Sequence, residues 1–295
     1  MAAELIDGKL LAQEMKAELK EQVSKLRDKG IIPGLGVILV GDNPASKSYV
    51  TSKEKACEKI GIFSDDTRLP EDVSEEDLLR HVERMNSDDN IHGILVQLPL
   101  PKHIDENRII NAINPHKDVD GFHPVSVGKM ILGQDTFLPC TPHGCLKLLE
   151  RYDVKTEGAE VVVIGRSNIV GKPVANLLMR KDKPGNSTVT VCHTRTRKED
   201  LLAHTKNADI IIVASGFPNT LTSDMVKEDV VVIDVGINRV VDSSRERGYR
   251  LIGDADFESL KDKVRKITPV PGGVGPMTIT MLLFNTVKSA QNTIK

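Results

Sequence analysis

The sequence predicts an α/β protein of two α/β domains around a cleft, the second of them doubly wound and of the Rossmann type. Strands and helices alternate along the first third of the chain, as they do in α/β layers. From about residue 160 onward, four apolar runs recur at the interval of a strand–helix unit. Their continuous apolar character is typical of parallel strands that are buried on both faces.

The first region is expected to hold three helices and three strands in alternation. In chain order they are a helix over 9–28, a strand over 35–40, a helix over 44–60, a strand over 63–69, a helix over 74–85 and a strand over 91–96. Asn43 and Pro44 are the residue types of an N-cap and a first helical position, and Gly61 is typical of a C-terminal stop. These three residues therefore frame the second helix.

The second region is predicted from its apolar runs and from the helices at its two ends. The expected strands lie over 161–164, 188–191, 210–214 and 230–234, and the expected helices over 144–152 and 277–292. We place the domain boundary in the helix over 144–152. The first domain is then residues 1–145 plus the C-terminal helix over 277–295, and the second domain is residues 146–276.

The composition excludes several classes of function. A net charge of -2 provides no basic field for nucleic acid or for a polybasic membrane contact, and 3% aromatic residues offer few stacking platforms. No signal peptide or apolar run of transmembrane length is found, so a cytoplasmic protein with reduced thiols is expected. His116 and His123 flank an acidic turn, but their spacing fits no ligand pair and no metal is expected. The spacing of the four cysteines matches neither zinc nor redox motifs: Cys57, Cys140, Cys145 and Cys192.

A strand-to-helix turn gives the cofactor signal. The strand over 161–164 leads through Gly165, Arg166 and Ser167 toward a helix near Gly171, where a dinucleotide pyrophosphate would meet the helix N-terminus. Ser167 stands where the standard G-x-G-x-x-G pattern has its second glycine, and the last glycine is one place late. An ordinary strand–helix turn remains the alternative.

The end of the next strand favours NADP over NAD. An NAD site presents a carboxylate there to bind the ribose 2′-hydroxyl, but this strand ends in Cys192-His193-Thr194-Arg195. Thr194 can offer a hydroxyl, and Arg195 with Arg166 can offer positive charge to a 2′-phosphate. A solvated surface charge is the alternative interpretation of Arg195.

Candidate catalytic residues lie in the first region. Tyr49 and Lys53 are four residues apart and share one helix face, where a lysine of lowered pKa can transfer protons. A chance pair on an exposed surface is the alternative. Gln97 lies at the carboxyl end of an apolar strand, where open α/β sheets bind ligands. The turn at Asp118-Val119-Asp120-Gly121 is acidic, and an Asx-type turn without a ligand is its alternative explanation.

Six of the eleven residues from Thr268 to Thr278 are glycine or proline. This density predicts a rigid loop without helix or central strand, against which a flat or anionic ligand can lie on bare backbone. A linker or tight turn is the simpler alternative for this segment taken alone.

As an ordered set, these motifs resemble the bifunctional methylenetetrahydrofolate dehydrogenase/methenyltetrahydrofolate cyclohydrolase family nearly end to end. They are Tyr49-x-x-x-Lys53, Val96-Gln97-Leu98-Pro99, Asp118-Val119-Asp120-Gly121, Gly165-Arg166-Ser167 with Val170-Gly171-x-Pro173, and the segment from Pro269 to Thr278. The resemblance implies oxidation of 5,10-methylenetetrahydrofolate to 5,10-methenyltetrahydrofolate with NADP, then hydrolysis to 10-formyltetrahydrofolate in one shared cleft. It also implies a folate-binding catalytic first domain, an NADP-binding second domain and a homodimer.

The resemblance further assigns roles to residues. Lys53 would be the catalytic lysine, which Gln97 tunes, while Tyr49 orients the pterin and Asp120 anchors its ring nitrogens. The implied folate contacts are Tyr49, Lys53, Val96, Gln97, Leu98, Asp120, Pro271, Gly272, Gly273, Gly275, Pro276 and Thr278. The implied NADP contacts are Gly165, Arg166, Ser167, Thr194, Arg195, Ser215, Gly216 and Ile237.

Two departures and two alternatives accompany the resemblance. Thr194 replaces the usual serine but keeps its hydroxyl, and the stretch 180–187 is longer than in many bacterial relatives. Another NADP-dependent α/β dehydrogenase, such as a shikimate-dehydrogenase-like reductase, would leave the 268–278 loop and Gln97 without a role. A non-enzymatic NADP-sensing protein is expected to have lost some of the four candidate catalytic residues, and all four are present.

Overall fold

The computed structural model describes residues 2–245 and 248–294. The chain folds as two compact units. One, called here the six-stranded unit, is Thr141–Thr278 together with the N-terminal residues through Ala12. The other, the three-stranded unit, is Gln13–Cys140 together with the C-terminal residues from Ile279. Within the described ranges, no helix combines the length and the apolar character that crossing a bilayer requires.

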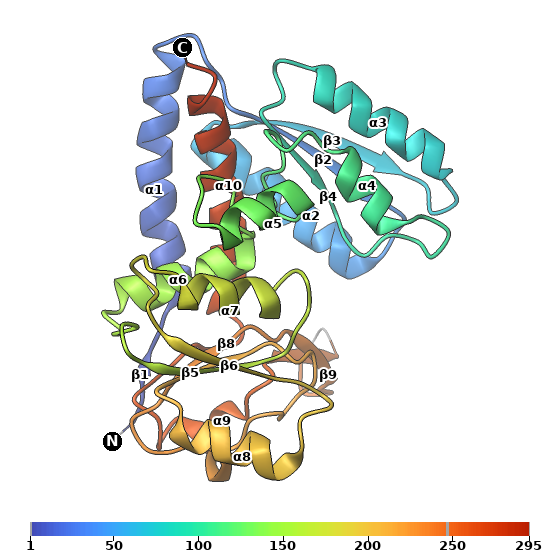
Figure 1. The fold of residues 1–295 in the computed structure, drawn as a ribbon. Helices are drawn as coiled ribbons and strands as arrows, with labels where there is room; N and C mark the ends of the chain where they lie inside the picture. The colour runs from blue at the N-terminus through green and yellow to red at the C-terminus, as the bar shows by residue number, and fades with distance from the viewer. Residues whose placement is uncertain (1, 246–247, 295) are drawn as a thin grey trace. The chain divides into compact units, whose positions relative to one another are not determined.

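The three-stranded unit is a parallel sheet flanked by helices (Figure 1). Its strand order is β3-β2-β4, with bounds β2 Gly34–Val40, β3 Phe63–Leu69 and β4 Gly93–Val96. Its helices, two of which continue into the other unit, are α1 Gly8–Arg27, α2 Pro44–Ile60, α3 Glu75–Ser87, α4 Glu106–Ala112, α5 Pro124–Ile131 and α10 Val274–Gln291. The predicted frame of α2 is confirmed: the Asn43 side chain accepts from two first-turn amides, and Gly61 is left-handed with φ 88°.

The six-stranded unit is a doubly wound parallel sheet, as the sequence predicts. Its order is β1-β11-β8-β7-β5-β6, with bounds β1 Glu4–Leu5, β5 Glu160–Ile164, β6 Thr188–Cys192, β7 Ile210–Val213, β8 Val231–Asp234 and β11 Lys266–Ile267. Helices α8 Lys198–Asn207 and α9 Phe257–Leu260 cover one face of the sheet, and α7 Gly171–Met179 covers the other (Figure 1). The sequence did not predict the antiparallel hairpin of β9 Asn238–Val241 and β10 Tyr249–Ile252.

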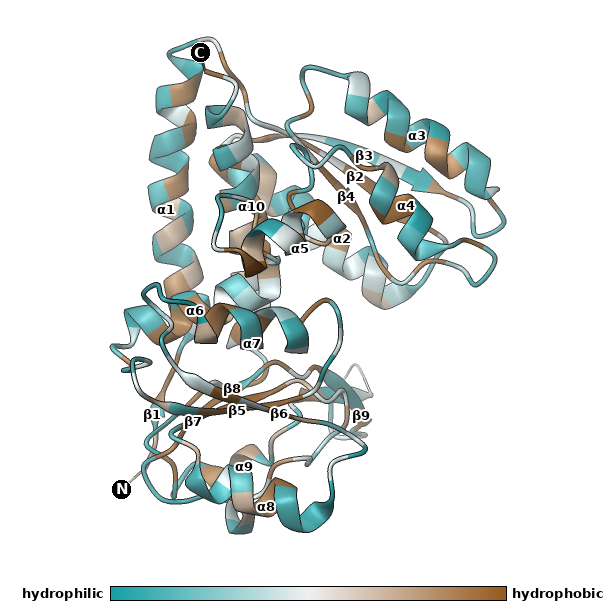
Figure 2. Cartoon of the chain, viewed as in Figure 1, coloured by the Kyte–Doolittle hydropathy of each residue, from teal (hydrophilic) through white to brown (hydrophobic). Residues whose placement is uncertain are grey.

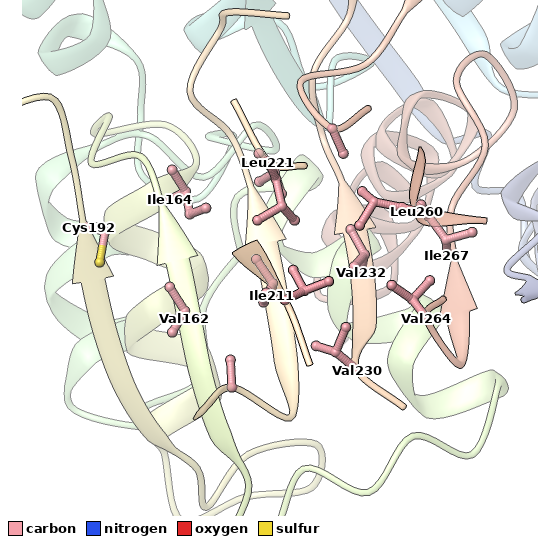
Figure 3. Close-up of a cluster of buried hydrophobic side chains, with 14 residues drawn as sticks. Val162, Ile164, Cys192, Ile211, Leu221, Val230, Val232, Leu260, Val264 and Ile267 are labelled. Carbon is pink, nitrogen blue, oxygen red and sulfur yellow. The ribbon is translucent and has the colours of Figure 1, made fainter. Parts of the chain in front are cut away.

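The central strands of the six-stranded unit form an apolar layer, which is brown in Figure 2. Side chains from β5, β7 and β8, including Val162, Ile211 and Val232, pack with Leu260 of α9 and Ile267 of β11 (Figure 3). Burial on both faces explains why these strands read as uninterrupted apolar runs. This core supports the carboxyl ends of the strands, where the polar loops begin.

Two helices begin earlier than expected, and both correct a prediction. Helix α10 starts at Val274, so the last five residues of the 268–278 segment are helical although the glycine and proline content predicts a loop throughout. Helix α6 likewise spans Cys140–Arg151 rather than starting at Gly144. In both helices a proline, Pro276 or Pro142, lies in the first turn. Proline is tolerated there because first-turn amides have no acceptor within the helix.

Candidate active site

A buried lysine is the centre of a polar cluster in the three-stranded unit. Lys53 of α2 is 4% exposed, and its Nζ donates a hydrogen bond to Oε1 of Gln97 at 3.0 Å. The same Nζ lies 4.9 Å from the centre of the Tyr49 ring, one turn earlier on the helix. Gln97 follows β4 directly, and its backbone amide donates to Ile38 of β2 at 2.8 Å. Sheet register and helix spacing therefore bring Tyr49, Lys53 and Gln97 together.

Burial lowers the pKa of Lys53, because a charged amine loses its hydration in the protein interior. The negative charge of Asp120 acts in the opposite direction without cancelling this effect. Burial also raises the pKa of Asp120, and the positive charge of Lys53 offsets part of that rise. The pKa of Lys53 is lowered and that of Asp120 is raised, so the two values lie closer together than in water. Such values suit groups that exchange protons with a ligand.

A thiol that the sequence analysis did not assign to the site lies beside this pair. Cys140 is 1% exposed; its thiol donates to the Val119 carbonyl at 3.3 Å and lies beside the Asp120 carboxyl. Burial raises the pKa of Cys140 well above its usual value, and the charge of Asp120 adds to the rise, so the thiol stays protonated. Its setting, Pro139-Cys140-Thr141-Pro142, was visible in the sequence, but no spacing pattern marks a single buried thiol as part of a site.

The two carboxylates of the acidic turn have different roles: Asp118 holds the backbone, and Asp120 belongs to the site. Asp118 is buried and accepts the backbone amides of Phe122 at 3.2 Å and His123 at 2.9 Å. Burial raises the pKa of Asp118 to about 6. Asn285 of α10 braces the same turn, donating to the Val119 carbonyl at 2.8 Å. Asp118 thus braces the backbone four and five residues further on, which is a longer span than an Asx-type turn has, and Asp120 is the residue whose charge acts on Lys53.

The two histidines near this turn have structural bonds. Nδ1 of His123 accepts the amide of Val125 and caps α5, while the carbonyl of His116 accepts the hydroxyl of Ser289. Across residues 2–245 and 248–294, no group of three histidine, cysteine or acidic residues is placed to hold a metal ion.

The predicted nucleotide turn lies at the switch point of the six-stranded sheet, where β5 pairs with β6 on one side and β7 on the other. Gly165 has φ +129°, and an added Cβ would lie 2.1 Å from the carbonyl oxygen of Ala214. At Gly171 a Cβ would lie 2.2 Å from the Gly165 carbonyl oxygen. Both positions require glycine, because the helix, the turn and the strand end approach one another backbone to backbone.

The polar residues of this turn face outward or bond to the start of the helix. Oγ of Ser167 accepts the amides of Val170 at 3.1 Å and Gly171 at 3.4 Å, so it ties the turn to the start of α7, whose N-cap residue is Val170. The exposed Arg166 is the neighbour of Ser167 in the same turn. Thr194 and Arg195 are also exposed, just beyond the carboxyl end of β6.

Ser215 and Gly216 follow β7, and Ile237 follows β8 with its side chain 54% exposed. A Cβ added at Gly275 would lie 3.5 Å from Cδ1 of Ile237, so one predicted NADP residue lies within packing distance of one predicted folate residue. Two buried carboxylates that no sequence motif indicated, Asp234 and Asp254, brace these strand ends. Acidic residues at such positions give no sequence signal, because their partners are backbone amides of distant loops.

The 268–278 segment is fixed by backbone contacts. The amide of Lys9 donates to the Gly272 carbonyl at 2.9 Å, and a Cβ on Gly8 would lie 1.9 Å from the Gly273 carbonyl oxygen. The hydroxyls of Thr278 and Thr141 are 2.9 Å apart. A cavity of about 970 Å³ borders Pro269 to Pro271 and the β9–β10 hairpin, and its walls include Asp234. Among the described residues that line this cavity, Pro271 is the one predicted ligand contact, and no residue of the Lys53 cluster is included.

Comparisons with known proteins agree over nearly the whole chain. Residues 6–120 match the catalytic domain of the tetrahydrofolate dehydrogenase/cyclohydrolase family, and residues 139–294 match the NAD(P)-binding domain of that family. The bifunctional protein FolD of Syntrophus aciditrophicus is 57% identical over 291 residues, which cover 99% of this chain and 98% of that protein.

Solved structures show the same likeness in three dimensions. The bifunctional FolD methylenetetrahydrofolate dehydrogenase/cyclohydrolase of Campylobacter jejuni is 54% identical with a TM-score of 0.93, covering 99% of this chain and 100% of that one. The Trypanosoma brucei methylenetetrahydrofolate dehydrogenase-cyclohydrolase, solved with NADP cofactor and an inhibitor, is 39% identical with a TM-score of 0.95. That match covers 100% of this chain and 99% of the other.

Proposed function

The chain belongs to the tetrahydrofolate dehydrogenase/cyclohydrolase family, and on that premise we propose that it carries out both reactions of a bifunctional, NADP-dependent enzyme. It oxidises 5,10-methylenetetrahydrofolate to 5,10-methenyltetrahydrofolate and hydrolyses the product to 10-formyltetrahydrofolate. The sequence alone left two alternatives open, a shikimate-dehydrogenase-like reductase and a non-enzymatic NADP-sensing protein. Because both halves of the chain match this family, we set both alternatives aside.

The observation that carries the proposal for the catalytic residues is the buried Lys53, held by Gln97 Oε1 at 3.0 Å and balanced by the charge of Asp120. A buried lysine with one neutral hydrogen-bond partner and a lowered pKa is unusual for a structural residue, which would be paired or exposed. It is the arrangement expected of a lysine that gives up and regains a proton during turnover.

The switch-point residues fit a dinucleotide. Gly165 lets the turn pack against the carboxyl end of β7, which forms the tight strand-to-helix turn that a pyrophosphate site needs. The exposed Arg166, Thr194 and Arg195 can bind phosphate groups. The remaining proposed contacts are Ser167, Ser215, Gly216 and Ile237. When bound, NADP would supply the acceptor for the hydride that the methylene carbon of the folate loses. The oxidised carbon is stabilised by its two nitrogen neighbours, so the protein has to position the reactants but need not supply a base.

Hydrolysis does require proton transfer by the protein. The water that adds to the methenyl carbon must lose a proton, and the folate nitrogen that leaves this carbon must gain one. We assign both transfers to Lys53 Nζ, with Gln97 holding the amine, Tyr49 orienting the pterin and Asp120 anchoring its ring nitrogens. The other proposed folate contacts are Val96, Leu98, Pro271, Gly272, Gly273, Gly275, Pro276 and Thr278.

A homodimer in the cytoplasm completes the proposal. The four cysteines are free and buried, which agrees with a reducing compartment. Sedimentation at several protein concentrations would test the dimer, and a monomer at micromolar concentration would contradict it.

One absorbance experiment tests both activities. Purified protein is mixed with methylenetetrahydrofolate and either NADP or NAD, and the methenyl band is followed through its formation and decay. We expect the band to form faster with NADP, then to decay faster than in a protein-free solution of methenyltetrahydrofolate. No change with either cofactor would reject the proposed function.

A further inference from the structure

One buried carboxylate forms hydrogen bonds to the segments that follow β7 and β8. Asp254, between β10 and α9, is 0% exposed. Its Oδ2 accepts the backbone amides of Ser215 and Gly216, each at 2.7 Å, and the hydroxyl of Ser215 at 3.0 Å. Its Oδ1 accepts Nδ2 of Asn238 at 2.8 Å. A single side chain thus bonds to the turn that follows β7 and to the first residue of β9, which are separate in sequence.

Asp254 is itself held firmly. Its amide donates to Oδ1 of Asp234 at 3.0 Å, and its carbonyl accepts the amide of Thr220 at 2.7 Å. A Cβ added at Gly236 would lie 2.1 Å from Oδ1 of Asp254, so the surrounding backbone is closely fitted to this carboxylate. Fully bonded and tightly enclosed, the side chain has one arrangement, which it imposes on its partners.

The turn at Ser215 and Gly216 faces Asp254 on one side and solvent on the other, and Ile237, next to Asn238, is also exposed to solvent. The amides of Ser215 and Gly216 point at the carboxylate, while Gly216 itself is exposed and the Ile237 side chain is 54% exposed. Gly216 has φ +77°, a conformation that a free glycine exchanges readily with others. Two consecutive amides bonded to one oxygen fix both peptide planes, so the exposed face has a defined shape.

We infer that Asp254 is a positioning residue for NADP, which fixes the Ser215–Gly216 turn and the Ile237–Asn238 segment in the form that receives the cofactor. The inference rests on the proposed function, which assigns Ser215, Gly216 and Ile237 to the cofactor. Asp254 does not touch NADP. It acts by removing loop freedom before binding, so that less conformational entropy is lost when the cofactor binds.

The test is the variant Asp254→Asn, which keeps the shape but turns an amide donor toward either Asn238 Nδ2 or the two backbone amides. We expect the Kd for NADP, measured by titration calorimetry, to rise roughly 10- to 100-fold. The KM for NADP should rise more than kcat falls. Hydrolysis of supplied methenyltetrahydrofolate, which consumes no NADP, should keep the wild-type rate and reports that the variant is folded.

The matched control is Asp256→Asn. Asp256 lies two residues away and caps α9 through the amide of Ser259, a task that asparagine performs equally well. This variant should bind NADP as the wild type does. Unchanged NADP affinity in Asp254→Asn, or equal losses in both variants, would overturn the inference.

Amide hydrogen exchange provides a second readout that needs no activity, and its wild-type measurement is informative without the variant. In the wild type without NADP, the amides of Ser215 and Gly216 should exchange slowly, and in Asp254→Asn faster. Exchange at the unprotected rate in the wild type would refute the inference, even if the variant failed to fold. Failure of the wild type to bind NADP would instead reject the proposed function, and the exchange rates would still decide whether Asp254 fixes the turn.

Discussion

The two units bury charged side chains in different ways. In the three-stranded unit, Lys53 has Gln97 as its hydrogen-bond acceptor, and burial lowers its pKa. In the six-stranded unit, Asp234 and Asp254 are also buried, but each accepts backbone amides. Asp234 accepts those of Gly236, Asp254 and Ala255 at 2.9 to 3.0 Å.

The difference lies in what the charge is bonded to. A buried ion with few partners can give up its charge and regain it, so it remains chemically available. A carboxylate surrounded by amides fixes the backbone that surrounds it, and its contribution is shape. The comparison predicts that changing the buried charge of the three-stranded unit affects reaction steps. Changes around the strand ends of the six-stranded unit should instead affect stability and cofactor affinity.

The largest effect is expected from Lys53→Met, which removes the amine and keeps an unbranched apolar chain in the buried site. Hydrolysis of methenyltetrahydrofolate should fall by about 10³-fold or more, because general acid–base transfer is lost. The Kd for NADP should stay unchanged by calorimetry. Lys55→Met, at an exposed position on the same helix, should hydrolyse normally. Full hydrolysis by Lys53→Met would remove the lysine from the mechanism.

A backbone change in the second region should come next. Gly165→Ala places a Cβ 2.1 Å from the Ala214 carbonyl at φ +129°. The free energy of unfolding in urea should fall by about 3 kcal/mol, since both strain and overlap are introduced. Gly158→Ala shares a positive φ of +73° but meets no atom within 4 Å, so it should cost only about 1 kcal/mol. Equal losses would show that the close approach at Gly165 has no energetic weight.

A smaller effect concerns pH. Burial raises the pKa of Asp234 to about 6, so the folded state holds this proton more tightly than the unfolded state. The contribution of Asp234 to stability is therefore full at low pH and is lost as the pH rises through about 6. From pH 7 to pH 5 the wild type should gain about 1 kcal/mol of unfolding free energy relative to Asp234→Asn.

The control for this pH effect is Asp242→Asn. Hydrogen bonds from Ser244 lower the pKa of Asp242, so this variant should follow the wild-type curve between pH 5 and 7. Parallel curves for the wild type and Asp234→Asn would mean that Asp234 does not titrate as proposed.

The smallest effect is expected from Thr194→Val, which removes a hydroxyl from the proposed 2′-phosphate site. The KM for NADP should rise about 5- to 10-fold, the value of one hydrogen bond, while the KM for NAD stays constant. Thr188→Val, at the opposite end of β6, should change neither value. A parallel rise for both cofactors would place Thr194 outside the phosphate contact.

Local signals predicted the fold better than the site. Helix α2 was correct at both ends because Asn43 and Gly61 act on their own helix. The starts of α6 and α10 were missed because a first-turn proline looks the same as a loop proline in sequence. Tyr49, Lys53 and Gln97 came from helix spacing and a strand end, but Cys140, Asp234 and Asp254 depend on distant backbone groups. No spacing rule describes such contacts, so these three residues were missed.

The pairing of β1 with β11 has a consequence for the order of folding. Residues Glu4 and Leu5 pair with Lys266 and Ile267, and Gly8 packs on Gly273. During synthesis Glu4 and Leu5 leave the ribosome long before their partners exist, so this edge of the six-stranded sheet cannot form until β11 has been made. The three-stranded sheet, from β2 to β4, can form meanwhile. The loop proposed to hold the folate follows β11, so it is fixed only after the three-stranded sheet can form, and a nascent chain should not bind folate before then.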